Sequence, residues 1–522
     1  MADFIDARTD FDGEEVEGSI AIIGAGAAGI TLARELSKAN REVILIESGG
    51  LELEGDTQAL YAGQNLGLPY FNLAACRLRY FGGTTNHWAG YCRANDEVDY
   101  MERPEVGLPG WPITHDDLAP YVARAATSLG IADDFFDPAK LIADKGFAVD
   151  DLGERQSPIL ETKVAQIAED IRLGKNHRDE LQANPNVRIF LHANATNINL
   201  VPSGNAVDHI AIRTLNGRSF RVRAKRFIIA CHAIENARLL LSSNDVAKEG
   251  IGNASDHVGR HFMDHIYITA SRFYPSASFP KLYDRMVLRK ERLNANLGFT
   301  DKELQKSGLL QYYLRFIPRF LSETNRSSFE NVQAGFFEPG SLQYLRDLAA
   351  VATDPIGALK LAYSKRSPGR FVPDHYDLEH RIEQAPNADC RVVLSENTDV
   401  LGSRIADLDF KISDYDIDTL ARAQELMARE VSALGWGRFQ LETIDRSLVE
   451  SRFLGHYHNI GTTRMASDPT NGVCNSDSQV FGVDNLYMAG SSLFPSAGYS
   501  GPTMMLIALS LRLADHIGRV EA

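Results

Sequence analysis

The stretch "SIAIIGAGAAGITLARELSKANREVILIES" (Ser19–Ser48) decides the fold class of this 522-residue chain. An apolar run predicts a β-strand, and a glycine-rich turn follows it. Apolar residues at helical spacing then predict a helix, and "EVILIE" predicts a second strand. This order of strand, turn, helix and strand is typical of the first unit of a dinucleotide-binding α/β fold. We therefore expect a Rossmann-like parallel sheet.

The turn inside this stretch carries Gly24, Gly26 and Gly29 in GxGxxG spacing. Glycines permit the tight turn and let backbone N–H groups approach a pyrophosphate at the helix N-terminus. Glu47 ends the second strand, 23 residues after Gly24, where a carboxylate can accept hydrogen bonds from ribose hydroxyls. The turn therefore predicts a dinucleotide cofactor. It does not distinguish FAD from NAD, and Glu47 disfavours NADP.

The chain exceeds a single ordinary core, and its character changes along its length. Glycine-punctuated segments at both ends flank a central region with aromatic stretches and charged, turn-rich connections. We expect an α/β protein in which a Rossmann-like cofactor-binding domain holds an inserted α+β substrate-binding domain. The first domain would comprise residues 1–95, 187–270 and 452–522. The second, with connecting segments, would comprise residues 96–186 and 271–451.

The composition argues against several functional classes. A formal net charge of −15 disfavours nucleic acid or an anionic membrane surface as a partner. Five cysteines without CxxC spacing disfavour a disulfide framework or a zinc site and fit a reducing compartment. Since no run of about 18 apolar residues is present, we expect no membrane span. The acidic first residues lack the apolar stretch of a secretory signal, so we expect a cytoplasmic protein.

Two further glycine-containing segments are candidates for contact with the cofactor. In "RYFGGTTNHWAG" (Arg79–Gly90), Gly82 and Gly83 would let backbone lie against a planar ring or phosphates without a Cβ clash. The second segment is "FGVDNLYMAGSSLFPSAGYSGPTMM" (Phe481–Met505). It contains a short expected strand, a glycine, and a proline that can open the C-terminal helix without losing a hydrogen bond.

The stretch "LGHYHNIGTTRM" (Leu454–Met465) places His456 and His458 two residues apart. A metal site, a structural role and a catalytic base are the alternatives. Metal binding needs further ligands, and no cysteine or carboxylate lies beside the two histidines in the sequence, so we expect no metal. The choice between the other two depends on the cofactor.

These motifs resemble the glucose–methanol–choline (GMC) oxidoreductase family of flavoenzymes, and more closely its pyranose-2-oxidase-like bacterial branch. The matching blocks follow the family order over nearly the whole chain. They are GAGAAG, GGTTNHW, "GWPITHDDLAPYV", "IENARLLLSS", "VGRHFMDH", "CRVVLSENTDVLGSRIADLDF", and "HNIGTTRM" through "GPTMMLIALSLRLADHI". The resemblance implies an FAD-binding domain and a substrate domain whose sheet covers the reactive face of the flavin. It also implies oxidation of a CH–OH group in an alcohol or sugar-like substrate, with hydride transfer to flavin N5 and electrons passed to oxygen or a separate acceptor.

The resemblance also assigns roles to residues. His458 stands where the family keeps its catalytic histidine, and an imidazole with a pKa near neutrality suits a general base for the hydroxyl proton. His87 stands where some members bond covalently to the flavin, although we favour FAD that is not covalently bound. The residues expected to contact FAD are Gly24, Gly26, Gly29, Glu47, Gly82, Gly83, Asn86, His87, Ala489, Gly490, Pro502 and Thr503.

Gly501 departs from the family pattern, which usually has Asn or His immediately before this proline as the second member of a catalytic pair. The candidates to replace that side chain are Asn459, Tyr499, Ser500 and His456. The departure leaves an alternative function open, namely altered chemistry on the same scaffold such as desaturation, decarboxylation or an internal redox step. A flavin-loaded binding protein without catalysis is a third interpretation. The sequence does not identify the substrate, the electron acceptor or the oligomeric state.

Overall fold

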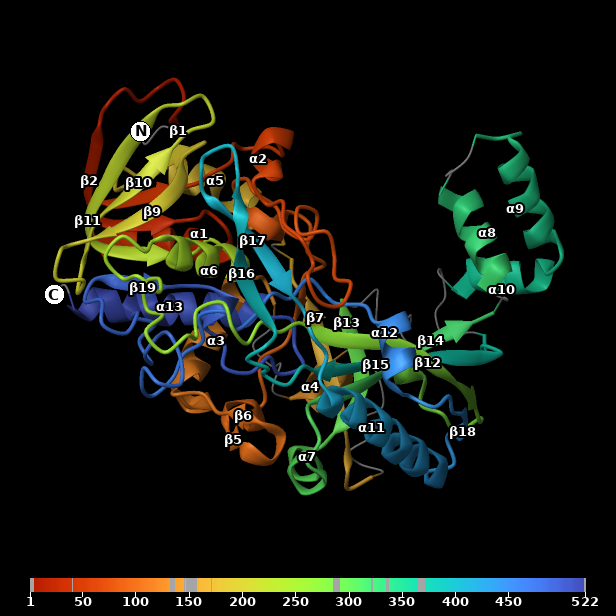
Figure 1. The fold of residues 1–522 in the computed structure, drawn as a ribbon. Helices are drawn as coiled ribbons and strands as arrows, with labels where there is room; N and C mark the ends of the chain where they lie inside the picture. Colours follow the sequence, from red (N-terminus) through yellow and green to blue (C-terminus); the bar gives the residue numbers. More distant parts are fainter. Residues whose placement is uncertain are drawn as a thin grey trace.

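Two β-sheets organise the chain in this computed structural model (Figure 1). The structure describes residues 4–39, 41–131, 137–144, 146, 157–169, 171–284, 292–320, 323–334, 338–364 and 371–520. The first sheet has eight strands in the order β1-β8-β3-β2-β11-β10-β9, with β19 also paired to β11. Its strands are β1 (Phe4–Asp6), β2 (Glu15–Ile23), β3 (Val43–Ile46), β8 (Val187–Leu191), β9 (Asn194–Leu200), β10 (Val207–Arg213), β11 (Ser219–Ile229) and β19 (Leu486–Met488).

The strands β1, β8, β3, β2, β11 and β19 pair in parallel, whereas β9 and β10 form an antiparallel extension. All four residues of β3 are buried, as expected for a parallel strand covered on both faces. The expected strand, turn, helix and strand at the start of the chain are confirmed as β2, α1 (Ala27–Leu36) and β3.

The parallel register brings four strand ends to one edge of this sheet. Ile23, the last residue of β2, pairs with Ile46 of β3 and with Ile229 of β11. Ile229 in turn pairs with Met488 of β19. Because the segments that follow these strands emerge side by side, this edge is where an open α/β sheet binds its ligand.

The second sheet is antiparallel throughout, in the order β18-β12-β15-β14-β13-β7-β4. Its strands are β4 (Tyr91–Cys92), β7 (Leu160–Ile167), β12 (His265–Pro275), β13 (Leu293–Phe299), β14 (Tyr312–Arg319), β15 (His375–Glu383) and β18 (Gly437–Gln440). A mainly parallel sheet and an antiparallel sheet confirm the expected fold class. The domain boundaries stay a prediction, because β4 and the start of β12 come from ranges that we assigned to the FAD-binding domain.

Helices cover both sheets, and three of them stand apart. The helices α1, α3 (His115–Ser128) and α13 (Thr503–Val520) pack together beside the parallel sheet. The helices α8 (Glu323–Ala334), α9 (Leu342–Ala352) and α10 (Pro355–Ser364) lie away from both sheets (Figure 1). The other α-helices are α2 (Gly55–Ala59), α4 (Pro138–Ala143), α5 (Leu173–Ala183), α6 (Ala233–Ser242), α7 (Asp301–Ser307), α11 (Asp414–Ala433) and α12 (Arg446–Arg452). Two short hairpins pair β5 (Glu102–Arg103) with β6 (Leu108–Pro109) and β16 (Arg391–Thr398) with β17 (Arg404–Asp409). Among the described helices, none is both long enough and apolar enough to cross a bilayer.

The glycine turn between β2 and α1 requires glycine for two different reasons. Gly24 has φ +104°, a conformation that residues with a side chain rarely adopt. A Cβ on Gly29 would lie 1.8 Å from the Gly24 carbonyl oxygen, so α1 could not sit on the turn. At Gly26, in contrast, a Cβ would have no atom of the chain within 4 Å. Gly26 therefore leaves open space at the start of α1.

This difference gives a matched pair of substitutions. Gly29→Ala should destabilise the fold by about 1–3 kcal/mol or more, because backbone must move to admit the methyl group. Gly26→Glu should leave thermal unfolding of the cofactor-free protein nearly unchanged but abolish FAD binding, because a carboxylate would occupy the place of the pyrophosphate. Thermal unfolding and the flavin absorbance of the purified variants measure the two effects. Retention of FAD by Gly26→Glu would show that the dinucleotide lies elsewhere.

Candidate active site

One cavity of about 670 Å³ connects the two sheets. Gly24 and Glu47 line it at the edge where the parallel strands end, and Tyr313 and Arg381 line it at the antiparallel sheet. The cavity therefore has a dinucleotide end and an opposite end that faces the second sheet.

The dinucleotide end fits FAD. Gly26 opens α1 with free space in front of it, as a bound pyrophosphate requires. The carboxylate of Glu47 accepts hydrogen bonds from the N–H groups of Ala25 and Gly49, both at 2.9 Å, which fixes it in the cavity wall. A carboxylate has about four lone-pair sites, so Glu47 can still accept hydrogen bonds from ribose hydroxyls.

Most of the residues expected to contact FAD line this cavity. They are Gly24, Gly26, Glu47, Gly83, His87, Ala489, Gly490, Pro502 and Thr503. The other three are not among the lining residues and instead shape the adjoining turns. Gly29 packs against the turn before α1, and Gly82 has φ +96°. The side-chain amide of Asn86 donates to the carbonyl of Phe81 at 2.9 Å.

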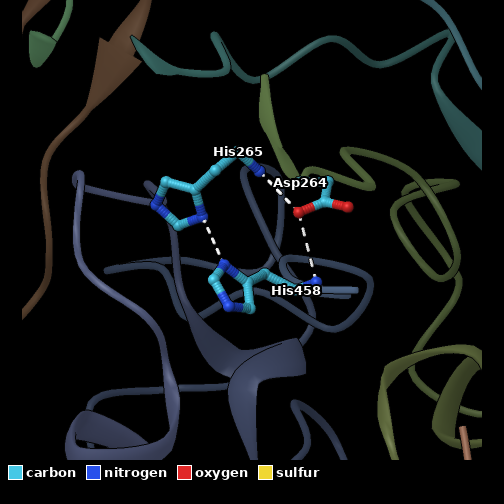
Figure 2. Close-up of side chains that lie close together, drawn as sticks. All are labelled: Asp264, His265 and His458. Carbon is cyan, nitrogen blue, oxygen red and sulfur yellow. Dashed lines mark hydrogen bonds between the residues drawn. The ribbon is translucent and has the colours of Figure 1, made fainter. Parts of the chain in front are cut away.

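His458 is paired with His265 through their Nδ1 atoms, which are 2.9 Å apart (Figure 2). His265 Nε2 lies 2.9 Å from the carbonyl oxygen of Gly498. Because a carbonyl only accepts, we assign the proton of the neutral His265 ring to Nε2. Its Nδ1 is then the acceptor, and His458 Nδ1 is the donor. His458 Nε2 therefore carries a lone pair and no proton.

Burial keeps these imidazoles neutral. It lowers the pKa of His265 to about 4 and holds the pKa values of His456 and His458 well below the usual histidine range. The positive charge of Arg381 lowers all three further. A neutral ring is the state that can accept a proton.

Asp264 fixes the backbone around both histidines (Figure 2). Its carboxylate accepts the N–H groups of His265 at 2.6 Å, His456 at 3.0 Å and His458 at 3.1 Å. The hydroxyl of Tyr70 donates to it at 2.6 Å. Burial raises the pKa of Asp264 to about 6, and these hydrogen bonds oppose that shift. Asp264 and His265 are absent from our sequence-based site; their only signal was the block "VGRHFMDH".

His456 lies nearly parallel to His458. The two ring centroids are 5.3 Å apart at 20°, and Tyr457 between them has φ +60°. A left-handed conformation is uncommon for a residue with a side chain and is found often at functional sites. His456 Nδ1 donates to the carbonyl of His265 at 3.2 Å, so its Nε2 is an acceptor.

Two potential metal ligands that are distant in the sequence lie beside His458 in the folded chain. Ligand atoms of Asp264, His265 and His458 lie within 4.8 Å of one another. Two nitrogen ligands of a tetrahedral zinc ion would be about 3.3 Å apart, whereas the two Nδ1 atoms are 2.9 Å apart. Both Asp264 oxygens also accept N–H or O–H donors. The geometry is therefore that of a hydrogen-bond network.

Gly501 faces the proton-free nitrogen of His458. A Cβ at this position would lie 3.5 Å from His458 Nε2 and 3.6 Å from the carbonyl oxygen of Tyr91, both ordinary contact distances. The space between Gly501 and His458 therefore admits at least a methyl group, which the sequence does not supply.

The other candidates for the second catalytic group differ in their hydrogen bonds. Asn459 donates from its amide to the hydroxyl of Tyr70 at 3.0 Å. Ser500 donates to the carbonyl of Arg93 at 2.8 Å. The hydroxyl of Tyr499 is buried and makes no hydrogen bond within the part of the chain that the structure describes. Tyr499 is thus the candidate whose donor is not already used.

The antiparallel sheet contributes a polar wall to the cavity. We define the polar wall as Asn294 and Asn296 of β13, Tyr313 and Arg315 of β14, and Arg381 of β15. The two-residue spacing places each pair on one face of its strand. Sequence reasoning did not find these residues.

Comparisons with known proteins agree with this geometry. The family model described as "GMC oxidoreductase" matches residues 386–510, and the model "FAD dependent oxidoreductase" matches residues 19–246. The chain is 23% identical to 2-methyl-1,2-propanediol dehydrogenase of Mycolicibacterium austroafricanum, over 96% of this chain and 95% of the relative. It is 22% identical to the fructose dehydrogenase large subunit of Gluconobacter japonicus, over 97% and 98%. It is 24% identical to 6'''-hydroxyparomomycin C oxidase of Streptomyces lividus, over 96% and 92%.

Solved structures share the fold. A formate oxidase superposes with a TM-score of 0.56 at 16% identity, over 97% of this chain and 99% of the other. Pyridoxine 4-oxidase from "Mesorbium loti" superposes with a TM-score of 0.53 at 17% identity, over 96% and 99%. The two family models, the full-length relatives and the dinucleotide end of the cavity together identify the chain as a member of the GMC oxidoreductase family, an FAD-dependent oxidoreductase that acts on CH–OH groups.

Proposed function

We propose that the substrate is a small alcohol or sugar-like molecule and that His458 is the general base for its hydroxyl proton. The observation that carries this proposal is the hydrogen-bond pattern of His458, whose Nδ1 donates to His265 and whose Nε2 faces the gap at Gly501 without a proton. An imidazole in this state can accept the hydroxyl proton while the hydride leaves carbon. Relatives named for a propanediol, for fructose and for a hydroxyparomomycin support a hydroxyl-bearing substrate.

FAD, when bound, supplies the hydride acceptor. The part played by the chain is to orient the hydroxyl and to hold its proton at His458 Nε2. His265 and Asp264 keep the His458 ring and backbone in place during this transfer. Because the relatives include both oxidases and dehydrogenases, oxygen and a separate electron acceptor are both compatible with this proposal.

Tyr499 is our candidate for the second group; its hydroxyl is buried in this structure, so contact with the substrate oxygen requires it to turn toward the cavity. A developing alkoxide needs a hydrogen-bond donor, which His456 Nε2 does not offer in its neutral form. The hydroxyl of Tyr499 is a donor without a partner among the described residues, and its residue lines the cavity two positions before Gly501.

His458→Ala should leave FAD bound but slow anaerobic flavin reduction by substrate about 10² to 10⁴-fold, because the proton acceptor is lost. In the unsubstituted enzyme the rate should stay constant from pH 8 down to pH 6.5, since the lowered pKa of His458 keeps the base neutral over this range. Stopped-flow absorbance measures both. His209→Ala is the control, because His209 lies on β10 of the parallel sheet, and flavin reduction in this variant should have the normal rate. A His458→Ala variant that reduces at the normal rate would disprove the base assignment.

Gly501→Asn distinguishes two explanations for the open space beside His458. If the site only lacks a donor, Asn should raise turnover of small alcohols, because a positioned hydrogen bond to an alkoxide is worth roughly 2–4 kcal/mol. If the gap makes room for substrate, Asn should block the native substrate. We expect the second result, since the new side chain would occupy the space in front of His458 Nε2. Gly501→Ala is the control for steric tolerance. If Gly501→Asn leaves turnover of the native substrate unchanged, the space beside Gly501 is not part of the substrate site.

FAD should not be covalently bound to His87. This residue lines the cavity with its side chain exposed, and partial desolvation lowers the pKa of its ring. Acid precipitation should therefore release the yellow colour into the supernatant. Colour that stays in the pellet, and that moves to the supernatant in His87→Ala, would show a covalent bond at this position.

Gly501 also favours one alternative, a reaction other than net alcohol oxidation on the same scaffold. Desaturation, decarboxylation or an internal redox step would not need a second residue on the substrate oxygen. Product formed without net reduction of any acceptor would support an internal redox step or a decarboxylation, whereas flavin bleaching by an alcohol or sugar with carbonyl product would exclude all three.

A further inference from the structure

We infer that the native substrate is an anion whose carboxylate or phosphate group binds Arg381 and Arg315 while its CH–OH group meets His458. This inference rests on the proposed function and adds the chemical class of the substrate. It is built on the distribution of charge along the cavity and on the geometry of the polar wall.

Charges of both signs line the dinucleotide end of the cavity, where Arg79 and Arg238 accompany the carboxylates, whereas the described lining at the antiparallel sheet carries positive charge alone. Its lining carboxylates are Glu47, Glu235 and Asp399. Glu47 belongs to the dinucleotide end, and Glu235 and Asp399 both pair with Arg238 of α6, next to that end. At the antiparallel sheet the charged lining residues among those described are all arginines, namely Arg93, Arg315 and Arg381. An anionic group is therefore best accommodated at this second end.

Strand register places the two arginines of the polar wall side by side. Arg381 lies opposite Tyr313, and Arg315 lies opposite Glu379, so all four side chains share one face of β14 and β15. The Oε1 atom of Glu379 accepts from Arg315 Nη1 at 3.0 Å and from Arg381 Nε at 2.6 Å. One carboxylate thus holds two guanidinium groups close together, and the three side chains keep a net positive charge.

Both arginines are held in place before any ligand binds. Arg315 is 6% exposed, and the side chain of Arg381 is 14% exposed. Arg381 Nη1 also donates to the hydroxyl of Tyr313 at 3.3 Å. Guanidinium groups with a fixed orientation bind carboxylate or phosphate oxygens well, because little side-chain freedom is lost on binding.

Aromatic side chains in contact with one another lie between Arg381 and His458, the proposed base. The guanidinium carbon of Arg381 lies 5.0 Å from the Tyr267 ring centroid, which is 4.6 Å from the His456 ring. His456 is in turn stacked on His458. The charge of Arg381 also contributes to the lowered pKa of His458. The anion-binding groups and the proton acceptor therefore belong to the same end of the cavity.

Matched pairs of compounds test the charge requirement. Glucose is compared with glucuronate and with glucose 6-phosphate, and 1,2-propanediol is compared with lactate, by anaerobic flavin reduction of the FAD-loaded enzyme. In at least one set the anionic member should bind 10-fold or more tightly than the neutral one. The two glucose derivatives distinguish carboxylate from phosphate. Neutral members that bind as well as the anionic ones in both sets would overturn the inference.

Substitutions test the assigned residues. Arg381→Gln should raise the Kd of the preferred anion about 10- to 100-fold, because charge-assisted hydrogen bonds are lost, and should raise the Kd of the neutral partner much less. Arg381→Lys should recover part of the affinity, and Arg315→Gln should weaken anion binding in the same direction. Arg272→Gln is the matched control, since Arg272 lies on β12 of the same sheet with its side chain 54% exposed. An Arg381→Gln enzyme with unchanged anion affinity would contradict the assignment.

Acetate and inorganic phosphate separate this inference from the proposed oxidation. Neither can be oxidised here, so they report binding alone through shifts in the flavin absorption spectrum. A spectral shift that weakens in Arg381→Gln supports the anion site, whether or not any compound of the panel reduces the flavin. Failure of every compound to reduce the flavin would count against the proposed oxidation only. If neither anion shifts the spectrum or inhibits flavin reduction, the anion site is disproved, whereas reduction by glucose or propanediol would leave the proposed oxidation intact.

Discussion

The buried carboxylate of Asp264 is the constraint on which the rest of the site depends. It accepts three backbone N–H groups and one hydroxyl, which come from segments far apart in the sequence. Burying a carboxylate is unfavourable, and the raised pKa of Asp264 reflects that cost. Two of the four donors, the N–H groups of His456 and His458, flank Tyr457 and reach the carboxylate from a turn in which Tyr457 is left-handed. The same interaction therefore fixes the histidine loop and makes any other path of that loop costly.

The position of this carboxylate also links the two sheets functionally. Asp264 immediately precedes β12, the strand that begins with His265 and belongs to the antiparallel sheet. His458 lies between α12 and β19, at the start of the segment that returns to the parallel sheet. The pairing of His265 with His458 therefore sets His458, our proposed base, at the junction between the dinucleotide end of the cavity and the polar wall.

Local patterns in the sequence were sufficient for the parallel sheet and its turn. The turn needs a residue with positive φ, which is Gly24, and the next strand ends in a carboxylate, which is Glu47. Both features follow from chain geometry over about 25 residues. The contacts of His458 with Asp264 and His265 could not be predicted in the same way. Asp264 and His458 are 194 residues apart and meet only in the folded chain. The polar wall was missed for a similar reason. The register of β14 against β15, which brings Arg315 and Arg381 together, depends on long-range pairing that one sequence does not specify.

The gap at Gly501 and the arginines of the polar wall can be understood together. A neutral alcohol has only its hydroxyl to orient it, so a second polar residue beside the base contributes much to positioning. An anionic substrate held by Arg315 and Arg381 is oriented from its other end, as binding energy remote from the reacting bond can be used for positioning. Its hydroxyl then needs the base but depends less on a side chain at Gly501. In this arrangement the space in front of His458 Nε2 is part of the substrate site, and the loss of one catalytic side chain accompanies the gain of a charged anchor.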